Sequence, residues 1–418
     1  MTVVGLDDTD ARTGACTTYV AARLADALEG RGHLVERALL VRCNPAVEHK
    51  TRGNAALAVH TDAPVEVALS LARDEIDDGA ATGPDTNPGL VVAPGDPADV
   101  PAAVADFARE AVRGYHEIAD ARTLAEQAGY RTAAWGEGRG RIGALAAVGA
   151  WAAFDEWTVE HVAYRPAERR GEPREVSEDA LFAAADRAYP AAWDTVDRGA
   201  GEAVCVPHTP GPVLVGVRGD DPDAVDAVLD AVEGEPVERT RRFLTNQGTD
   251  AHLRDAPLEA VRDGYAYRTT GTVASEPETR EGGHVFVDLT EDDATLPAVA
   301  FEPTKRFRDR VRALRPGDRV TACGEVARGT LKLEKFAVRD LVTSETVPPT
   351  CCGRRMESAG ADQGYRCRSC GETAAEPAEQ GLDRALAVGW YEVPPRARRH
   401  VAKPLVRGGF DGPVHPER

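Results

Sequence analysis

Short apolar runs alternate with stretches of helical spacing over the first 262 residues of the chain. Residues 3–6 predict a strand that ends at an acidic cluster, and residues 17–28 predict a helix, because apolar side chains recur three and four positions apart. The same signals predict further strands at 39–41, 55–60, 204–207 and 213–218, and a further helix at 222–232. This βαβ-like rhythm favours small α/β or ferredoxin-like units.

From about residue 263 the pattern changes to short strands that are separated by turns. Strands are expected at 267–273, 284–289, 296–301, 319–326 and 331–338, with one helix at 308–314. Five such strands within about 80 residues fit a small barrel of the OB type. A proline pair at 348–349 and a group of cysteines mark a boundary near residue 345.

The chain of 418 residues is too long for a single core, so its length predicts three or four domains. It contains no run of about 18 apolar residues, and its first residues lack the basic region of a secretion signal. We therefore expect a soluble, cytoplasmic protein that has no membrane partner.

The net charge of −19 would ordinarily argue against a nucleic-acid partner, because phosphate binding relies on Lys and Arg. However, only five residues are Lys, whereas 69 are Asp or Glu, a balance that suits a proteome adapted to high salt. The overall charge then indicates a high-salt habitat and says little about whether the protein binds nucleic acid. Local charge differs from this average, since residues 396–407 are basic.

An acidic cluster follows the first predicted strand and contains Asp7, Asp8 and Asp10. Carboxylates in this arrangement suit Mg²⁺, whose coordination shell nucleotide phosphates can complete. Thr17 and Thr18 begin the next helix, so that a hydroxyl there could bind or accept a phosphoryl group. Two simpler interpretations compete with these roles: a turn built from the acids, and capping of the helix by the threonines.

Two further segments, residues 50–54 and 138–143, combine flexible glycines with cations. Residues 138–143 match the dinucleotide-binding glycine pattern, but no strong strand precedes them, so a Rossmann assignment is weak. Glycines that allow close approach and cations that attract phosphate are still present in both segments. The candidate phosphate-binding residues are Lys50, Arg52, Gly53, Gly138, Arg139, Gly140, Arg141 and Gly143. Charged turns without function are the alternative.

Four cysteines lie between residues 351 and 370. Cys367 and Cys370 have the spacing of a zinc knuckle, and Cys352 with the glycine after it supplies an earlier half. Cys351 and Cys352 are adjacent where two residues usually intervene, which makes Cys351 the least secure ligand. A structural zinc ribbon is favoured over a three-cysteine site or an inert thiol cluster.

A barrel, a ribbon and a basic tail in series are typical of proteins that bind RNA. Lys305, Arg306 and Phe307 bring an aromatic ring and cations together, as base stacking and phosphate contact require, although the ring may belong to the core. The cations expected to contact RNA from the tail are Arg396, Arg398, Arg399 and Lys403.

Together these motifs resemble a known enzyme family. The segments 5–10, 16–19, 50–54, 86–89, 138–149, 301–307 and 391–403, in this order along nearly the whole chain, are similar to the archaeal tRNA(Ile) 2-agmatinylcytidine synthetases. Members of this family replace the C2 oxygen of the wobble cytidine in the CAU anticodon with agmatine. They use ATP and release AMP, so that the minor isoleucine tRNA reads AUA.

The resemblance implies a multidomain α+β fold. A split kinase-like α/β domain would occupy 1–60 and 135–200, and a ferredoxin-like domain 61–134 and 201–262. An OB-fold β-barrel would occupy 263–345, followed by the zinc ribbon and basic tail at 346–418. No obligatory protein partner is implied.

The resemblance also implies roles for the candidate residues. Asp7, Asp8 and Asp10 would hold Mg²⁺ and position ATP, and Thr17 would be autophosphorylated. The remaining phosphate-binding candidates, with Thr18, would clamp ATP. For agmatine, the candidates are His208, Thr209, Thr245 and Asn246. Phosphorylation of the C2 oxygen would make it a leaving group and divide one difficult displacement into two easier steps.

Two other classes of protein compete with this interpretation. A non-catalytic RNA-binding protein would need only the barrel and the ribbon, and would leave the acidic cluster without a role. A small-molecule kinase with an accessory nucleic-acid domain would release ADP without tRNA. Magnesium-dependent ATP consumption, and its dependence on tRNA, distinguishes the three.

Overall fold

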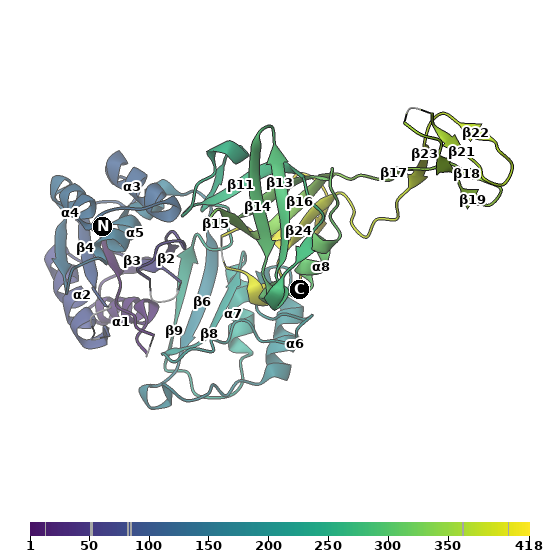
Figure 1. Ribbon diagram of the computed structural model, residues 1–418. Coiled ribbons are helices and arrows are strands. Elements are labelled where there is room, and N and C mark those ends of the chain that lie inside the picture. Colours follow the sequence, from purple (N-terminus) through teal and green to yellow (C-terminus); the bar gives the residue numbers. More distant parts are fainter. Residues whose placement is uncertain (13, 51–52, 82, 84–85, 362, 400) are drawn as a thin grey trace.

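The structure is a computed structural model that describes residues 1–418 except 13, 51–52, 82, 84–85, 362 and 400. It is a multidomain α+β protein with a nine-stranded sheet, a closed five-stranded barrel and a small β ribbon that projects from the barrel (Figure 1). None of the helices in the described ranges is both long and apolar enough to span a membrane.

The first sheet has the strand order β5-β4-β1-β3-β2-β9-β6-β8-β7. Its strands are β1 (Thr2–Asp7), β2 (Val35–Arg42), β3 (Ala55–Thr61), β4 (Gly89–Pro94), β5 (Arg131–Ala134), β6 (Thr158–Tyr164), β7 (Ala192–Trp193), β8 (Val213–Gly219) and β9 (Arg239–Thr245). The parallel pair β2 and β9 joins its two halves, with Leu39 opposite Leu244. All other neighbours in this sheet are antiparallel.

Helices cover both faces of this sheet because β1 alternates its side chains between them. Val4 and Leu6 pack toward α1 and α2, whereas Val3 packs toward α3, α4 and α5. Gly5 allows α5 to approach closely, since a Cβ there would lie 2.1 Å from the carbonyl oxygen of Ala144. The helices are α1 (Thr17–Gly30), α2 (Val65–Gly79), α3 (Ala102–Arg113), α4 (Ile118–Gln127), α5 (Arg141–Ala153), α6 (Glu178–Ala188) and α7 (Pro222–Asp230).

The barrel closes through the pairs β11-β13-β14-β16-β15-β11. Its strands are β11 (Ala266–Val273), β13 (Val285–Glu291), β14 (Ala294–Ala300), β15 (Arg319–Ala327) and β16 (Thr330–Asp340), with α8 (Phe307–Arg312) between β14 and β15. The five strands and the helix predicted from the sequence are confirmed. The short strands β10 (Leu253–Asp255) and β12 (Glu278–Thr279) extend its edges.

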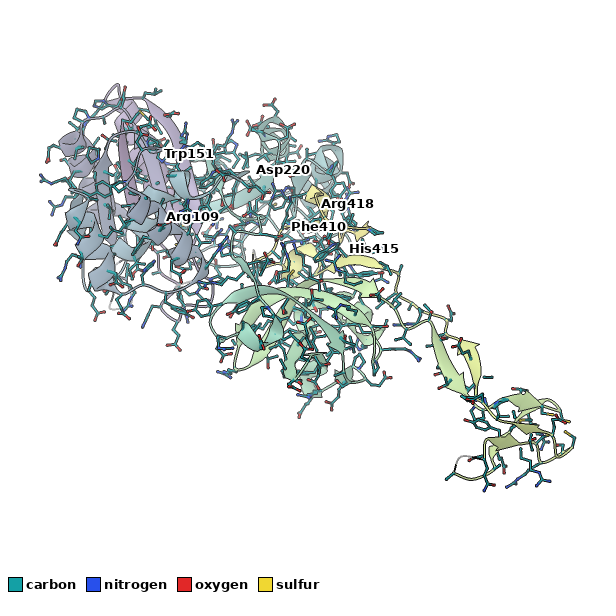
Figure 2. All side chains as sticks on the ribbon, turned by 90° about the horizontal axis from the view of Figure 1, so that it is seen from above. Arg109, Trp151, Asp220, Phe410, His415 and Arg418 are labelled. Carbon is teal, nitrogen blue, oxygen red and sulfur yellow. The ribbon has the colours of Figure 1, made fainter. Side chains whose placement is uncertain are left out.

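The ribbon is an insertion between two strands of the barrel sheet. It contains β17 (Ser344–Val347), β18 (Thr350–Cys351), β19 (Arg354–Arg355), β20 (Glu357–Ser358), β21 (Tyr365–Arg366), β22 (Thr373–Ala374) and β23 (Ala378–Gly381). The chain then returns, because β24 (Gly389–Glu392) pairs with β16 and β25 (Val414–His415) pairs with β24. Figure 2 accordingly shows Phe410, His415 and Arg418 beside the centre of the molecule, away from the ribbon. The basic segment is therefore not a free tail.

The structure bears on two of the sequence predictions, at residues 204–207 and in the order of strands within the first sheet. The strand predicted at 204–207 is wrong, because this segment forms turns: Cys205 hydrogen-bonds to the backbone of Thr195 and Gly216, and the Val206 N–H donates back to the Ala203 carbonyl. The strands β4 and β5 lie at the β1 end of the sheet, and β8 and β9 lie next to β6, so the sheet does not place 61–134 beside 201–262. The division into functional domains stays a prediction.

Candidate active site

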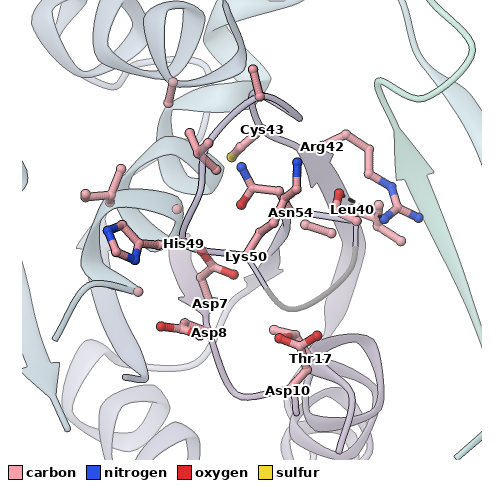
Figure 3. Close-up of a pocket in the computed structure, with 18 of the residues that line it drawn as sticks. Asp7, Asp8, Asp10, Thr17, Leu40, Arg42, Cys43, His49, Lys50 and Asn54 are labelled. Atoms are coloured by element: carbon pink, nitrogen blue, oxygen red, sulfur yellow. Dashed lines mark hydrogen bonds between the residues drawn. The ribbon is translucent and has the colours of Figure 1, made fainter. Parts of the chain in front are cut away.

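A cavity of about 1100 Å³ lies where the two halves of the first sheet meet the barrel. Its walls are the loops after β1 and β2, the first turns of α1 and α5, parts of β6 and β8, and the barrel residues 263–264 and 325–328. Figure 3 shows Asp7 at the end of β1, Asp8 on the loop after it, Thr17 at the start of α1, and Lys50 on the loop after β2. Segments far apart in the sequence therefore contribute to one site.

The acidic loop, residues 7–10, is held in an unusual conformation. Asp8 has a φ of 58°, which non-glycine residues seldom adopt, and its Oδ2 accepts a hydrogen bond of 3.1 Å from the Asn87 N–H. Thr9 is fully buried, and its hydroxyl has no hydrogen-bond partner among the described residues. A constrained loop that aims carboxylates into a cavity is typical of a functional site.

Electrostatics favour a cation at this loop over a simple turn. Burial raises the pKa of Asp7 well above its usual value, and the neighbouring charge of Asp8 raises it further. Burial, opposed by the hydrogen bond from Asn87, raises the pKa of Asp8 to about 6. Within the described ranges, neither residue forms an ion pair with Lys or Arg. A bound divalent cation would relieve this repulsion, and oxygen ligands suit Mg²⁺.

Two glycines of the glycine-arginine segment pack against the acidic loop. A Cβ on Gly143 would lie 1.9 Å from Oδ2 of Asp7, and one on Gly140 would lie 2.6 Å from its carbonyl oxygen. Helix α5 begins at Arg141, so the missing side chains let the Asp7 carboxylate sit against the first turn of this helix. The preceding β5 is a short edge strand, which agrees with a weak Rossmann assignment.

Both candidate hydroxyls line the cavity. Thr17 is the first residue of α1 and is buried, and Thr18 lies 3.1 Å from Cys16 through its Oγ and the cysteine Sγ. The N-cap of α1 is Cys16, without a side-chain capping bond. Helix capping therefore does not account for either threonine.

The other phosphate-binding candidates divide into three groups. Lys50, Gly53, Arg139, Gly140 and Gly143 line the cavity. Gly138 and Arg141 are not part of its described wall, and the Arg141 Nε donates to the Gly138 carbonyl at 3.2 Å. Arg52 lies outside the described residues.

A carboxylate on β6 was missed by the sequence reasoning. Glu160 is 4% exposed, lines the cavity, and its Oε1 accepts from Arg218 at 3.2 Å. Its Oε2 has no hydrogen-bond partner among the described residues, with the Arg42 guanidinium 3.9 Å away. Alternation along β6 places Glu160 on the same face as Val162. A charged residue on an otherwise apolar strand face was the sequence signal that could have marked Glu160 as a site residue.

The four agmatine candidates lie outside the described wall of the cavity. His208 has an 81% exposed side chain near Glu202, and the carbonyl of Thr209 accepts from Arg174. Thr245 and Asn246 are fully buried. The Asn246 side chain accepts from the Arg42 N–H at 2.7 Å and donates to the Arg42 carbonyl at 3.0 Å, so it fixes the end of β2.

The tRNA candidates are engaged mainly with the protein itself. Phe307 is fully buried in the barrel core, which is the packing alternative left open by the sequence. Lys305 pairs with Glu302, and Arg306 pairs with Asp197 and Glu417. The tail residues form the ion pairs Arg396–Glu202, Arg398–Asp194, Arg398–Glu392, Arg399–Glu325, Arg399–Glu334 and Lys403–Glu156.

The four ribbon cysteines converge on one point, with all four Sγ atoms within 4.8 Å of one another. The Sγ of Cys351 lies 3.9 Å from that of Cys352 and 3.4 Å from that of Cys370. Four sulfurs bound to one zinc at about 2.3 Å would be about 3.8 Å apart. Backbone N–H groups of Cys370 and Ser369 lower the pKa of Cys367 to about 6, which favours a thiolate. The residues fit zinc, and adjacency does not prevent Cys351 from joining the set.

Comparisons with known proteins agree along the whole chain. Three family models match: the TiaS TCKD domain at 3–66, the TiaS FLD domain at 138–252 and the TiaS C-terminal zinc ribbon domain at 348–386. The isoleucine-tRNA 2-agmatinylcytidine synthetase TiaS of Haloquadratum walsbyi is 52% identical, with 100% of both chains covered. That of Archaeoglobus fulgidus is 38% identical, with 98% of both covered.

Solved structures give the same result. The crystal structure of a complex of TiaS with its isoleucine tRNA and ATP superposes with a TM-score of 0.89 at 38% identity, covering 100% of this chain and 99% of that one. A complex of TiaS with the same tRNA, AMPCPP and agmatine gives 0.87 at 36% identity, with the same coverage. With this identity over full length, the chain belongs to the TiaS family of isoleucine-tRNA 2-agmatinylcytidine synthetases.

Proposed function

We propose that this protein ligates agmatine to C2 of the wobble cytidine of the minor isoleucine tRNA, which has a CAU anticodon, at the expense of ATP. The observation that carries the proposal is a single cavity that contains an acidic loop, two helix-start hydroxyls and a buried carboxylate, with the barrel as one wall. A non-catalytic RNA-binding protein would have no use for this combination. Relatives of this chain have been solved with an isoleucine tRNA, ATP and agmatine.

Asp7, Asp8 and Asp10 would hold Mg²⁺, which when bound would neutralise and orient the phosphates of ATP. The raised pKa values of Asp7 and Asp8 support this role, because a divalent cation would relieve their repulsion. Lys50 and Arg139 line the same cavity and supply positive charge for the phosphates. Arg52, Gly53, Gly138 and Arg141 remain candidates for the same clamp.

Thr17 is the proposed acceptor in self-phosphorylation, with Thr18 beside it at the cavity wall. In the main reaction, the C2 oxygen of cytidine attacks a phosphorus of ATP and becomes a phosphate ester, while the bridging P–O bond of that phosphorus breaks and the other part of ATP leaves. The primary amine of agmatine then attacks C2, and the oxygen leaves with the phosphate. Each step forms one bond to the atom from which another group departs.

Glu160 is the proposed partner of the agmatine guanidinium. Its Oε2 is a buried acceptor that faces the cavity without a hydrogen-bond partner among the described residues. Leu40, Val162 and Val213 line the same cavity and suit the aliphatic part of agmatine. The Glu160→Gln variant should therefore raise the KM for agmatine about tenfold or more, with little change in the KM for ATP.

The proposal also assigns domain types to the barrel and to the first sheet. The closed barrel is proposed to be an OB fold, and the first sheet to contain the kinase-like and ferredoxin-like domains implied by the resemblance. The four ribbon cysteines would hold a structural zinc. A cytoplasmic location follows from a tRNA substrate.

Incorporation of labelled agmatine into tRNA, with mass spectrometry of the wobble cytidine, tests the function directly. AMP should form only when the minor isoleucine tRNA and agmatine are both present, apart from slow self-phosphorylation. Equal ATP turnover without tRNA, with ADP as the product, would instead indicate a small-molecule kinase. A methionine tRNA that shares the CAU anticodon is the matched control substrate and should remain unmodified.

A further inference from the structure

A second cavity of about 260 Å³ opens beside the candidate active site. It shares Arg42, Cys43, Lys50, Gly53 and Glu325 with the main cavity, so the two adjoin at these residues. Its remaining wall comes from Pro45, His252, Arg398 and Arg399. We call it the side pocket. Of its wall residues, the proposed phosphate clamp uses only Lys50 and Gly53, both at the boundary with the main cavity.

His252 brings an unused acceptor to the side pocket. Its side chain is 2% exposed, and its Nε2 lies 3.1 Å from the carbonyl oxygen of Arg42. A carbonyl can only accept, so Nε2 carries the proton and Nδ1 is left with a lone pair. Burial lowers the pKa of His252 to about 4, which keeps the ring neutral. Nδ1 has no hydrogen-bond partner among the described residues.

The junction between the two cavities is cationic. Lys50 is exposed there, and Glu325 shares the junction with Arg42. Glu325 already pairs with Lys332 at 2.9 Å and with Arg399 at 3.2 Å, so its charge is satisfied by other partners. Lys50 forms no ion pair with the described residues. An anion at the junction would find this ammonium available.

These features match two consecutive nucleotides of one RNA strand. The nucleotides share one phosphate, which would lie at the cationic junction when the bases occupy the two cavities. A buried lone pair on a residue that lines the side pocket selects a base that presents an N–H donor to it. In a CAU anticodon the nucleotide after the reacting cytidine is adenosine, whose exocyclic amino group is such a donor.

We propose that the side pocket binds the middle adenosine of the anticodon, with its amino group donating to Nδ1 of His252 and the linking phosphate at Lys50. The inference rests on the proposed function for the identity of the RNA. It goes further by assigning a base-reading residue and a second subsite. An acceptor left unpaired in a buried pocket penalises any base without the donor.

Affinity for tRNA, measured without ATP or agmatine, tests the proposal separately from catalysis. The probe is the minor isoleucine tRNA whose middle anticodon adenosine is replaced by purine riboside, which lacks only the amino group. The full-length protein should bind this tRNA about tenfold more weakly than the adenosine form. Equal affinity for the two tRNAs overturns the proposal, whereas failure of agmatine incorporation alone would count against the proposed function.

Two variants localise the effect. The His252→Phe variant should bind both tRNAs with one common affinity, close to that of the wild type for the purine form. The control His33→Phe alters a histidine that pairs with Asp62 at the surface, and should keep the tenfold difference. If His252→Phe still distinguishes the two tRNAs, the amino group is read elsewhere and the assignment is wrong.

The phosphate contact has its own readout. The Lys50→Met variant should weaken binding of both tRNAs equally and lower the slope of log affinity against log salt by about one. The control Arg187→Met removes an exposed cation on α6 and should leave the slope unchanged. An unchanged slope for Lys50→Met would remove the phosphate from the junction.

Discussion

Two clusters of charge stand out in this chain, and the structure treats them in opposite ways. The acidic loop carries Asp7 and Asp8, whose carboxylates face a cavity without an ion pair among the described residues. The basic segment 396–407 lies against the rest of the molecule, and its cations are matched by carboxylates from distant parts of the chain. Examples are Arg398 with Asp194 and Arg407 with Asp220.

The difference shows what a charge cluster needs before a function can be assigned to it. Clustered acids that the protein leaves uncompensated have raised pKa values and gain from a cation supplied by a ligand. Clustered bases in a chain of net charge −19 find internal partners readily. The basic segment therefore fastens the chain end across the barrel and the first sheet, although its sequence resembles an RNA-binding tail.

Removing one charge from the acidic loop should have the largest effect. The Asp8→Asn variant keeps the size of the side chain but loses the charge that would hold Mg²⁺. We expect agmatine incorporation to fall by about 10⁴-fold or more, as for other groups that act directly in catalysis. Binding of tRNA without ATP should be unchanged, which a filter-binding titration can check.

Asp292→Asn is the matched control for that variant. Asp292 also has a positive φ, 50°, but lies in the turn between β13 and β14, away from the cavity. Its substitution should leave incorporation within about twofold of the wild type, as expected for a surface change. Near-normal activity of Asp8→Asn would make the acidic loop a structural turn and remove the contrast.

For the basic segment 396–407, we expect substitutions to change the stability of the protein more than its activity. Arg398 has a 4% exposed side chain between Asp194 and Glu392. The Arg398→Met variant would leave both carboxylates buried without their partner, so we expect the free energy of unfolding to fall by about 3–5 kcal/mol. Denaturant titration measures this change.

Arg399 provides the comparison within the same segment. Its side chain is 40% exposed and pairs with Glu325 and Glu334. The Arg399→Met variant should lose less, about 1–2 kcal/mol, because solvent screens the half-exposed Arg399 guanidinium although Glu334 itself is buried. If Arg398→Met were as stable as the wild type but bound tRNA more weakly, this segment would be an RNA-binding surface after all.

Local patterns predicted most elements but not their assembly. The five barrel strands and α8 were predicted because each depends on a local pattern, alternation for the strands and helical spacing for α8. The return of β24 to β16 pairs segments about 50 residues apart, across the inserted ribbon, and no local pattern records it. The same holds for the parallel pairing of β2 with β9, which brings the halves of the first sheet together.

The site shows the same limit. Asp7, Asp8, Thr17 and the glycines near Gly140 were predicted from compact motifs, and the structure brings them to one cavity. Glu160 was missed because a single carboxylate on a strand has no motif around it. The sequence left Phe307 open between a stacking platform and the core, because an aromatic residue beside cations looks alike in both, and the structure places it in the core.

The ribbon offers a smaller test of which basic surface serves tRNA. It joins the barrel only through its two-stranded stalk, β17 and β23, and a unit of this size needs a metal to fold. A zinc chelator, or the Cys370→Ser variant, should unfold only the ribbon from β18 to β22 and weaken tRNA binding by about tenfold. The main thermal transition should not move, and the neighbouring Ser369→Ala variant should bind as the wild type does. Unchanged tRNA affinity after zinc loss would assign recognition to the barrel and the first sheet.

The smallest effect is the share of the pH dependence that Asp8 contributes, beside a similar share from Asp194, whose pKa burial also raises to about 6. The pKa of Asp8 is about 6 in the folded protein and 3.8 ordinarily, so between these values the folded state binds more protons than the unfolded state. The free energy of unfolding should therefore fall as pH rises from about 4 to about 6, by an amount on the order of 1 kcal/mol, and stay lowered above that range. Asp8→Asn should abolish this part of the pH dependence at constant salt. Mg²⁺ should restore stability to the wild type above about pH 6 and have little effect near pH 4, where the carboxyl is protonated. Equal stabilisation by Mg²⁺ at both pH values would show that the ion binds elsewhere, because a site built from Asp8 must compete with its proton.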